Sequence, residues 1–340
     1  MSTVLVTGAA GHLGQRVVAR LSSLAEVDRV VGVDRRRMPV TGPKLEVHAL
    51  DLAGEGAAEE LAALAKSAGA VFHLAWDRPG TRNLVLLANV LDAATAIEPA
   101  QFVHMSSATV YGAWHDNPVP LTEEAPVRPN PGFAYATEKR AAEAMVERWQ
   151  SDRPETLVAV LRPACTLGSG GQPLPLAWTL RRHSAAPVGE EHLVQFVHAD
   201  DLASAAVHAF EVGLHGVYNV AADGGLPERD AAALLGRARS LRLPATSSKA
   251  ALGAGGRPAG PGARPYARHT WVVSPDKLRR TGWAAGYTSE EALVVTDRHG
   301  HWDDLPQAHR VSVTLGATAA AMVAAAAGGA AGWNWWKRRR

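Results

Sequence analysis

The sequence predicts an α/β fold: a doubly wound parallel sheet, a smaller C-terminal lobe and an Ala/Gly-rich C-terminal tail. In the first half of the chain, short apolar β runs alternate with helical patterns, as expected for a parallel sheet. A glycine-rich turn joins the first run to an amphipathic helix. From about residue 166 the alternation stops, and the stretch from Ala245 to Ala267 is rich in Gly, Pro, Ala and Ser, which is typical of a connection.

Six apolar runs are the expected strands. In chain order they are Val4 to Thr7, Val30 to Asp34, Leu45 to Ala49, Val71 to Ala75, Gln101 to Ser106 and Leu157 to Arg162. Ligands of such sheets lie beyond the carboxyl ends of the strands. Polar residues that follow these runs are therefore the first candidates for a binding site.

The turn after the first run contains three glycines spaced three apart. Gly8 lets the chain turn at the strand end, Gly11 leaves space for a pyrophosphate, and Gly14 lets the next helix lie close on the sheet. Asp34 ends the second run, where a carboxylate can accept both hydroxyls of an adenosine ribose. These features predict a Rossmann-type dinucleotide-binding domain.

Three arginines after Asp34 bear on the choice of cofactor. Arg35, Arg36 and Arg37 could contact a 2′-phosphate and would favour NADP, but the Asp34 carboxylate would repel that dianion. We therefore expect NAD, with NADP as the less favoured alternative.

A catalytic group is expected where the fifth run ends. Ser107 follows this run, while Tyr135 and Lys139 are four residues apart and share one face of a helix. An ammonium beside a phenol favours the phenolate, so we expect Lys139 to lower the pKa of Tyr135 and let it exchange a proton with a substrate hydroxyl. Ser107 would hold the same oxygen, and Lys139 would also reach the nicotinamide ribose.

Taken in order, these motifs resemble the extended short-chain dehydrogenase/reductases of the NAD-dependent epimerase/dehydratase group, over roughly residues 3 to 300. Further matches are Asp51-Leu52, His73-Leu74-Ala75, Asn83, Arg162-Pro163, the run Phe196 to Ala203, and Trp271 through Trp283. The resemblance implies that Ser107, Tyr135 and Lys139 are catalytic. The cofactor-binding residues that we expect are Gly8, Gly11, His12, Leu13, Gly14, Asp34, Arg35, Asp51, Leu52, Leu74, Ala75, Tyr135, Lys139 and Pro163.

Departures from the family pattern narrow the expected chemistry. Ala108 and Thr109 stand where sugar-nucleotide dehydratases of the family have an Asp-Glu pair, so we do not expect dehydration. The motif Ser-Ala-Thr-Val-Tyr-Gly resembles that of the 4-epimerases instead. The segment from Ala75 to Asn83, however, is short for an epimerase.

A second departure concerns the diphosphate of a sugar nucleotide. Val194-Gln195 stands where sugar-nucleotide enzymes usually have Arg-Asp, and a missing arginine removes a bidentate diphosphate contact. Arg264, or Arg181 with Arg182, could substitute for it.

These features predict an NAD-dependent oxidoreductase or epimerase that acts by hydride transfer at a secondary alcohol or ketone, with a sugar or sugar nucleotide as one candidate substrate. The alternative is a non-catalytic NAD(P)(H)-binding sensor or scaffold, whose mark would be loss of Tyr135 or Lys139. Both residues are present. The resemblance also implies a homodimer through the helices after Asn83 and Tyr135.

Composition limits the partners. The formal net charge is +2, so no global field would gather nucleic acid, and we expect a small-molecule substrate. The single cysteine, Cys165, excludes an internal disulfide framework and a cysteine-rich zinc site, which fits a cytoplasmic protein. No histidine pair has metal-ligand spacing, so we expect no metal.

We expect three parts: an NAD-binding domain at 1–165, a substrate-binding lobe at 166–300 with 193–208 returning to the first domain, and a tail at 301–340. Residues 311–332 contain no charge and precede a Trp- and Arg-rich end. Such a tail could lie on the inner membrane leaflet, span the bilayer or stay in solvent. Its Ala/Gly content and the positive-inside tendency favour contact with the inner leaflet through 311–340.

Overall fold

The computed structural model of the chain describes residues 2–38, 41–77, 80, 82–168, 192–234, 262 and 264–302. Met1–Val294 form one compact unit and Val295–Arg340 a second. Arg181, Arg182 and the tail segment 311–340 lie outside the described residues, and the division at 165 and 300 stays a prediction. Among the described residues, no helix combines the length and the apolar character needed to cross a bilayer.

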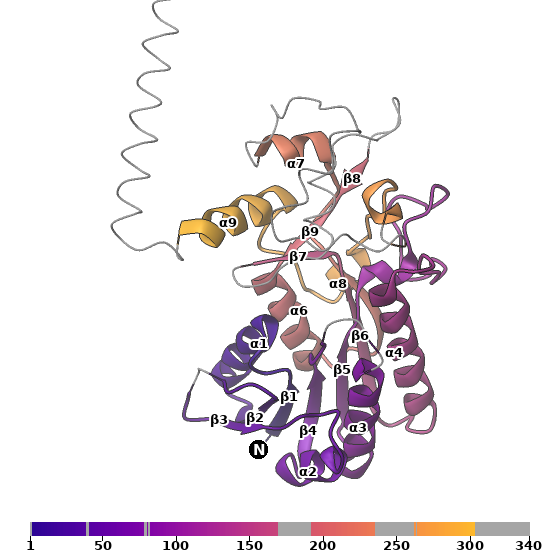
Figure 1. The fold of residues 1–340 in the computed structure, drawn as a ribbon. Helices are drawn as coiled ribbons and strands as arrows, with labels where there is room; N and C mark the ends of the chain where they lie inside the picture. The colour runs from indigo at the N-terminus through magenta and orange to yellow at the C-terminus, as the bar shows by residue number, and fades with distance from the viewer. Residues whose placement is uncertain are drawn as a thin grey trace, which may run out of the picture. The chain divides into compact units, whose positions relative to one another are not determined.

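A seven-stranded parallel sheet forms the centre of the first unit and confirms the predicted fold class (Figure 1). Its strands are β1 (Ser2–Thr7), β2 (Val27–Asp34), β3 (Leu45–Ala49), β4 (Ala68–His73), β5 (Gln101–Met105), β6 (Leu157–Pro163) and β10 (Gly216–Val220). Their order is β10-β6-β5-β4-β1-β2-β3. The strand order reverses between β1 and β4, and the crevice beyond the carboxyl ends at such a point is where dinucleotides bind.

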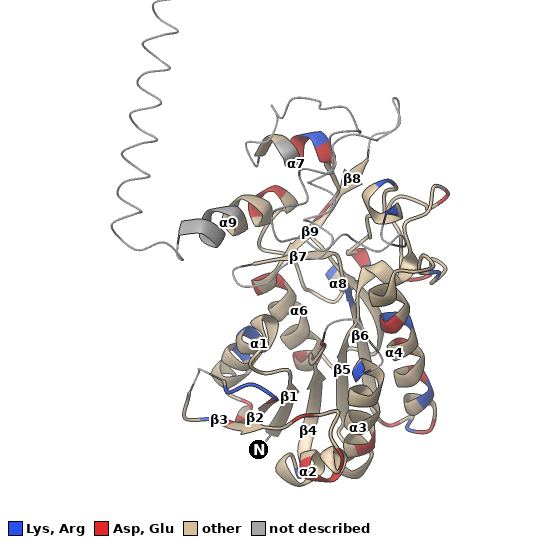
Figure 2. Ribbon diagram, in the orientation of Figure 1, with Lys and Arg blue, Asp and Glu red and all other residues tan. Residues whose placement is uncertain are grey.

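Helices cover both faces of the sheet (Figure 1). One face packs against α1 (His12–Ser23) and α6 (Ala199–Glu211), and the other against α2 (Ala57–Leu64), α3 (Arg82–Ile97) and α4 (Ala134–Ser151). Apart from the edge strand β3, whose residues are exposed or half-buried, the strands are largely buried and read as apolar runs. Figure 2 shows the same division, with charged residues on helices and loops and largely uncharged central strands.

β10 is a strand of the main sheet that the sequence analysis missed. It pairs in parallel with β6, placing Val220 beside Pro163. The buried amide of Asn219 interrupts the apolar run of this strand. Its Oδ1 accepts a hydrogen bond from the Tyr111 hydroxyl at 2.9 Å, so tertiary contact compensates for the polar residue.

Short elements follow β6 at the carboxyl end of the sheet. β7 (Cys165–Leu167) pairs with β9 (Phe196–His198) in parallel, and β8 (Leu193–Val194) pairs with β11 (Leu226–Pro227) in antiparallel fashion. The remaining described elements are η1 (Ala108–Tyr111), α7 (Glu228–Leu234), η5 (Pro265–Ala267), α8 (Asp276–Arg279) and α9 (Ser289–Trp302).

Candidate active site

Two glycines of the turn between β1 and α1, Gly8 and Gly14, have no room for a side chain. Gly8 has a φ of +74°, and a Cβ there would lie 2.6 Å from the amide nitrogen of Ala75. A Cβ at Gly14 would collide with the carbonyl oxygen of Gly8. Gly11 precedes α1 and no side chain caps the helix, so its first amides are not taken by a capping group. This backbone cradle fits a pyrophosphate.

A cavity of about 280 Å³ adjoins this turn, near the lower end of the range for small-molecule sites. Eight predicted cofactor-binding residues line it: Gly8, Gly11, Asp34, Arg35, Asp51, Leu52, Leu74 and Ala75. Arg36, considered above only as a contact for a 2′-phosphate, also lines the cavity, together with five residues that were not predicted: Leu50, Trp76, Asp77, Arg82 and Leu86. These residues follow β2, β3 or β4 or belong to the first turns of α3, and this position in the sequence could have identified them.

The remaining predicted cofactor residues, which include Tyr135 and Lys139, lie outside the lining of this cavity. His12, Leu13 and Gly14 form the first turn of α1, next to the cradle. Pro163 is buried at the end of β6. The predicted roles of these residues in binding remain predictions.

The Asp34 carboxylate is held at the edge of the cavity. Its Oδ2 accepts from the Ala10 N–H at 3.2 Å, and its Oδ1 accepts from the Arg36 N–H at 2.9 Å. Arg35 donates two hydrogen bonds to Asp77, at 2.6 and 3.2 Å. Because Arg35 is engaged with a carboxylate and Asp34 is ionisable at the predicted ribose position, the geometry favours NAD over NADP.

The start of α3 fixes the loop that follows β4. Asn83 Oδ1 accepts from the Asp77 N–H at 2.7 Å, and Asn83 Nδ2 donates to Glu138 on α4 at 2.9 Å. Arg82 pairs with Asp51 across the cavity, and this hydrogen bond lowers the pKa of the Asp51 carboxyl. The loop, α3 and α4 are thus joined where the cavity meets the predicted catalytic residues.

The structure brings the three predicted catalytic side chains together. Ser107 follows β5 and precedes η1, while Tyr135 and Lys139 lie one turn apart at the start of α4. Ser107 lies close enough to Tyr135 for its hydroxyl to act on the phenol and hold down the Tyr135 pKa. Lys139 Nζ donates to the carbonyl oxygen of Met105 at 2.8 Å, which anchors the ammonium at the end of β5.

The pKa of Tyr135 is shifted up, opposite to the predicted direction, and Lys139 is not among the causes of the shift. Burial raises the pKa of Tyr135, and the Ser107 hydroxyl opposes this rise. Lys139 Nζ lies 6.0 Å from the centre of the Tyr135 ring, and burial lowers the pKa of Lys139 to about 7. The prediction rested on charge alone, whereas removal of water raises the pKa of the phenol and lowers that of the ammonium, which weakens Lys139 as an activator.

Trp76 lies against the same lysine. Lys139 Nζ is 3.5 Å from the centre of the indole, within the range of a cation–π contact. The indole also stands edge-on to Tyr135, with 6.4 Å between the ring centres and 84° between the planes. Since Trp76 lines the cavity, it connects the cavity with the Tyr135 and Lys139 pair.

A buried ion pair supports this arrangement from behind. Arg162 on β6 donates to both carboxylate oxygens of Glu143 on α4, at 2.9 and 2.7 Å, and both side chains are almost fully buried. Ser106 also donates to Glu143, at 2.5 Å. The network holds α4, and with it Tyr135 and Lys139, against the ends of β5 and β6.

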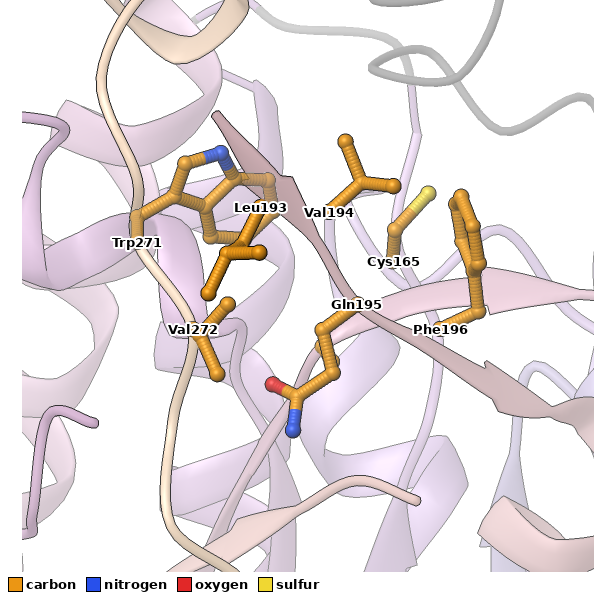
Figure 3. Close-up of a pocket in the computed structure, with 8 residues that line it drawn as sticks. Cys165, Leu193, Val194, Gln195, Phe196, Trp271 and Val272 are labelled. Carbon is orange, nitrogen blue, oxygen red and sulfur yellow. The ribbon is translucent and has the colours of Figure 1, made fainter. Parts of the chain in front are cut away.

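The position that lacks the family arginine is packed with apolar residues. A cavity of about 10 Å³, the space of roughly one water, lies at β8 and is lined by Ala164, Cys165, Leu193, Val194, Gln195, Phe196, Trp271 and Val272 (Figure 3). Gln195 Nε2 donates to Ala222 O and Val273 O, and its Oε1 accepts from the Val273 N–H. Val194 and Gln195 therefore serve packing and chain connection.

The sequence is similar to a known protein family and to bacterial proteins. Residues 4–221 match the model of the NAD dependent epimerase/dehydratase family. The chain is 32% identical over 237 residues to the uncharacterized protein y4nG of Sinorhizobium fredii, covering 65% of this chain and 57% of that protein. It is 27% identical over 248 residues to the uncharacterized protein Rv0501 of Mycobacterium tuberculosis, covering 65% and 62%. The chain thus spans about three fifths of the length of these relatives.

Solved structures share the fold. A UDP-glucose 4-epimerase of Thermus thermophilus in complex with NAD has a TM-score of 0.66 and 23% identity, covering 87% of this chain and 98% of that one. MoeE5 in complex with UDP-glucuronic acid and NAD has a TM-score of 0.65 and 24% identity, covering 88% and 98%. A dTDP-glucose 4,6-dehydratase of Bacillus anthracis in complex with NAD has a TM-score of 0.65 and 17% identity, covering 88% and 96%.

Proposed function

Because the chain belongs to the NAD dependent epimerase/dehydratase family, we propose that it binds NAD and transfers a hydride at a secondary alcohol or ketone. The observation that carries the proposal is the convergence of Ser107, Tyr135 and Lys139 beside the cavity of the glycine turn. NAD complexes among the solved structures of the same fold support the choice of cofactor.

In this proposal, bound NAD would accept or donate the hydride, and side chains of the protein accept or donate the proton. As the phenolate, Tyr135 takes the proton from the substrate hydroxyl at its phenolic oxygen, and as the phenol it returns that proton. Ser107 Oγ accepts from Thr109 Oγ1 at 2.9 Å and from the Thr109 N–H at 3.3 Å, which leaves the Ser107 hydrogen to be donated to Tyr135 or to the reacting oxygen. Lys139, when charged, stabilises the phenolate.

The substrate proposal stops at the secondary alcohol or ketone for a structural reason. Val194 stands where sugar-nucleotide enzymes usually have an arginine; it is 6% exposed and packs with Cys165, Leu226 and other apolar residues, so its side chain offers no donor to a diphosphate. UDP-sugars, which occur in solved structures of this fold, are the first candidates to test, together with simple secondary alcohols.

The test is the Tyr135→Phe variant, which removes one oxygen and keeps the ring. Turnover should fall by about a thousandfold, as for loss of a general acid/base, while the Kd for NAD⁺ from calorimetry stays nearly unchanged. The matched control is Tyr218→Phe, because the Tyr218 hydroxyl donates to His215 O on the segment before β10, away from the site.

Two outcomes would contradict the proposal. Residual turnover of Tyr135→Phe close to that of Tyr218→Phe would remove Tyr135 from the chemistry. Tight NAD⁺ binding by the wild type without hydride transfer to any tested alcohol or ketone would favour the sensor or scaffold role.

A further inference from the structure

Trp76 has a hydrogen-bond donor, the indole N–H, that no group in the described part of the chain accepts. Its indole Nε1–H is buried and has no hydrogen-bond partner among the described residues. The four other tryptophans whose side chains are described all donate: Trp114 to Arg128 O at 2.7 Å, Trp149 to Thr95 Oγ1 at 3.0 Å, Trp271 to Tyr266 O at 3.2 Å, and Trp283 to Ser204 Oγ at 3.0 Å. Because buried donors are nearly always paired, the exception at Trp76 calls for a partner from outside the chain.

The location of this indole indicates which ligand supplies the partner. Trp76 lines the cavity together with the glycine turn and Asp34. The Lys139 Nζ lies 3.5 Å from the centre of the indole, and the Tyr135 ring stands nearly perpendicular to it with 6.4 Å between the ring centres. A dinucleotide that runs from the Asp34 end of the cavity to the Tyr135 end would pass the indole with its middle section.

The backbone next to the indole is held in place. The Asp77 N–H donates to Asn83, and the Asp77 carboxylate accepts two hydrogen bonds from Arg35. Lys139, on which the ring lies, is fixed by its bond to Met105 O. The N–H donor is therefore positioned before any ligand arrives, which lowers the entropic cost of using it for binding.

We infer that Trp76 is a cofactor-binding residue whose indole N–H donates a hydrogen bond to an oxygen in the middle of bound NAD, in the pyrophosphate or the nicotinamide-side ribose. This inference rests on the proposed function and adds a side-chain contact to it. The face of the same ring holds the Lys139 ammonium, so one residue would bind the dinucleotide and orient the lysine that faces its ribose.

The test separates the N–H from the ring. Trp76→Phe keeps an aromatic face and removes the donor, and Trp114→Phe is the matched control because it removes an indole N–H that is already paired outside the cavity. Calorimetry measures the Kd of each protein for AMP, ADP-ribose and NAD⁺, and thermal unfolding measures the Tm of each protein without ligand.

The expected result has two parts. Trp76→Phe should weaken ADP-ribose and NAD⁺ by about tenfold and leave the affinity for AMP unchanged, because AMP lacks the middle section of the dinucleotide. Its Tm without ligand should fall less than that of Trp114→Phe, since no hydrogen bond of the free protein is lost at Trp76. Trp114→Phe should behave in the opposite way, with a lower Tm and unchanged affinities.

Two results would overturn the inference alone. Unchanged affinity of Trp76→Phe for NAD⁺ would show that the N–H makes no contact, and an equal loss for AMP would show that the ring only shapes the cavity. A wild-type protein that binds none of the three probes would overturn the proposed function itself, which keeps the two failures distinguishable.

Discussion

The buried lysine of the site makes stability depend on pH in a direction that can be measured. Lys139 is 3% exposed, and burial lowers its pKa from 10.5 to about 7. Replacing it in Lys139→Met removes the titrating group and keeps a side chain of similar length. Loss of the bond to Met105 O adds a cost to the variant that does not depend on pH.

The sign and size follow from linkage. Below pH 7 the lysine is charged in both states, so the wild type carries the full cost of burying the ammonium. Between pH 7 and 10.5 the folded state loses the proton first and the unfolded state binds more protons, so the stability of the wild type rises with pH. Because each pKa unit corresponds to 1.36 kcal/mol, the rise relative to Lys139→Met is at most about 5 kcal/mol.

Urea unfolding of both proteins from about pH 6 to about pH 10.5 measures this difference. The same pair in a Tyr135→Phe background serves as control, because it removes the titration of the neighbouring phenol. A difference in unfolding free energy that stays constant across this range would refute the reasoning that Lys139 is neutralised by burial.

Three further predictions concern other parts of the site. Arg162→Met should lower the unfolding free energy by about 3–5 kcal/mol, because Glu143 is left charged and buried without its partner, and Arg162→Met with Glu143→Leu should recover much of this loss in urea unfolding. Gly8→Ala should lower the Tm and abolish NAD⁺ binding in calorimetry, because φ is +74° and the new Cβ would meet the Ala75 backbone; normal binding would contradict the cradle. Asp34→Ala should shift the ratio of NADP⁺ to NAD⁺ affinities by about tenfold towards NADP⁺, because the repulsion is lost while Arg36 remains nearby; an unchanged ratio would exclude Asp34 as the discriminating residue.

Much of the fold could be predicted because its signals are local. The six expected strands are short β runs, five of them largely apolar, and the structure contains all six within a few residues of the predicted bounds. β10 was missed because its buried Asn219 is satisfied by Tyr111, a residue more than a hundred positions away. A polar residue that depends on such a distant partner cannot be separated from a loop residue by pattern alone.

The candidate site could likewise be predicted only in part. Helical spacing brought Tyr135 and Lys139 to one face, and the end of a strand placed Ser107 near them. Burial was not available from spacing, so the direction of the Tyr135 pKa was wrong. Trp76 was missed for a related reason. Its contact with Lys139 joins residues far apart in the sequence, and its N–H can be recognised as unpaired among the described residues only in three dimensions.

A crystal structure of the protein with NAD⁺ tests the central claim most directly. The account predicts that the pyrophosphate lies on the glycine turn, that Asp34 contacts the adenosine ribose, and that the nicotinamide ring lies beside the Ser107 and Tyr135 hydroxyls with room for one alcohol between them. A nicotinamide ring that points away from Tyr135, or a dinucleotide bound elsewhere on the molecule, would contradict it.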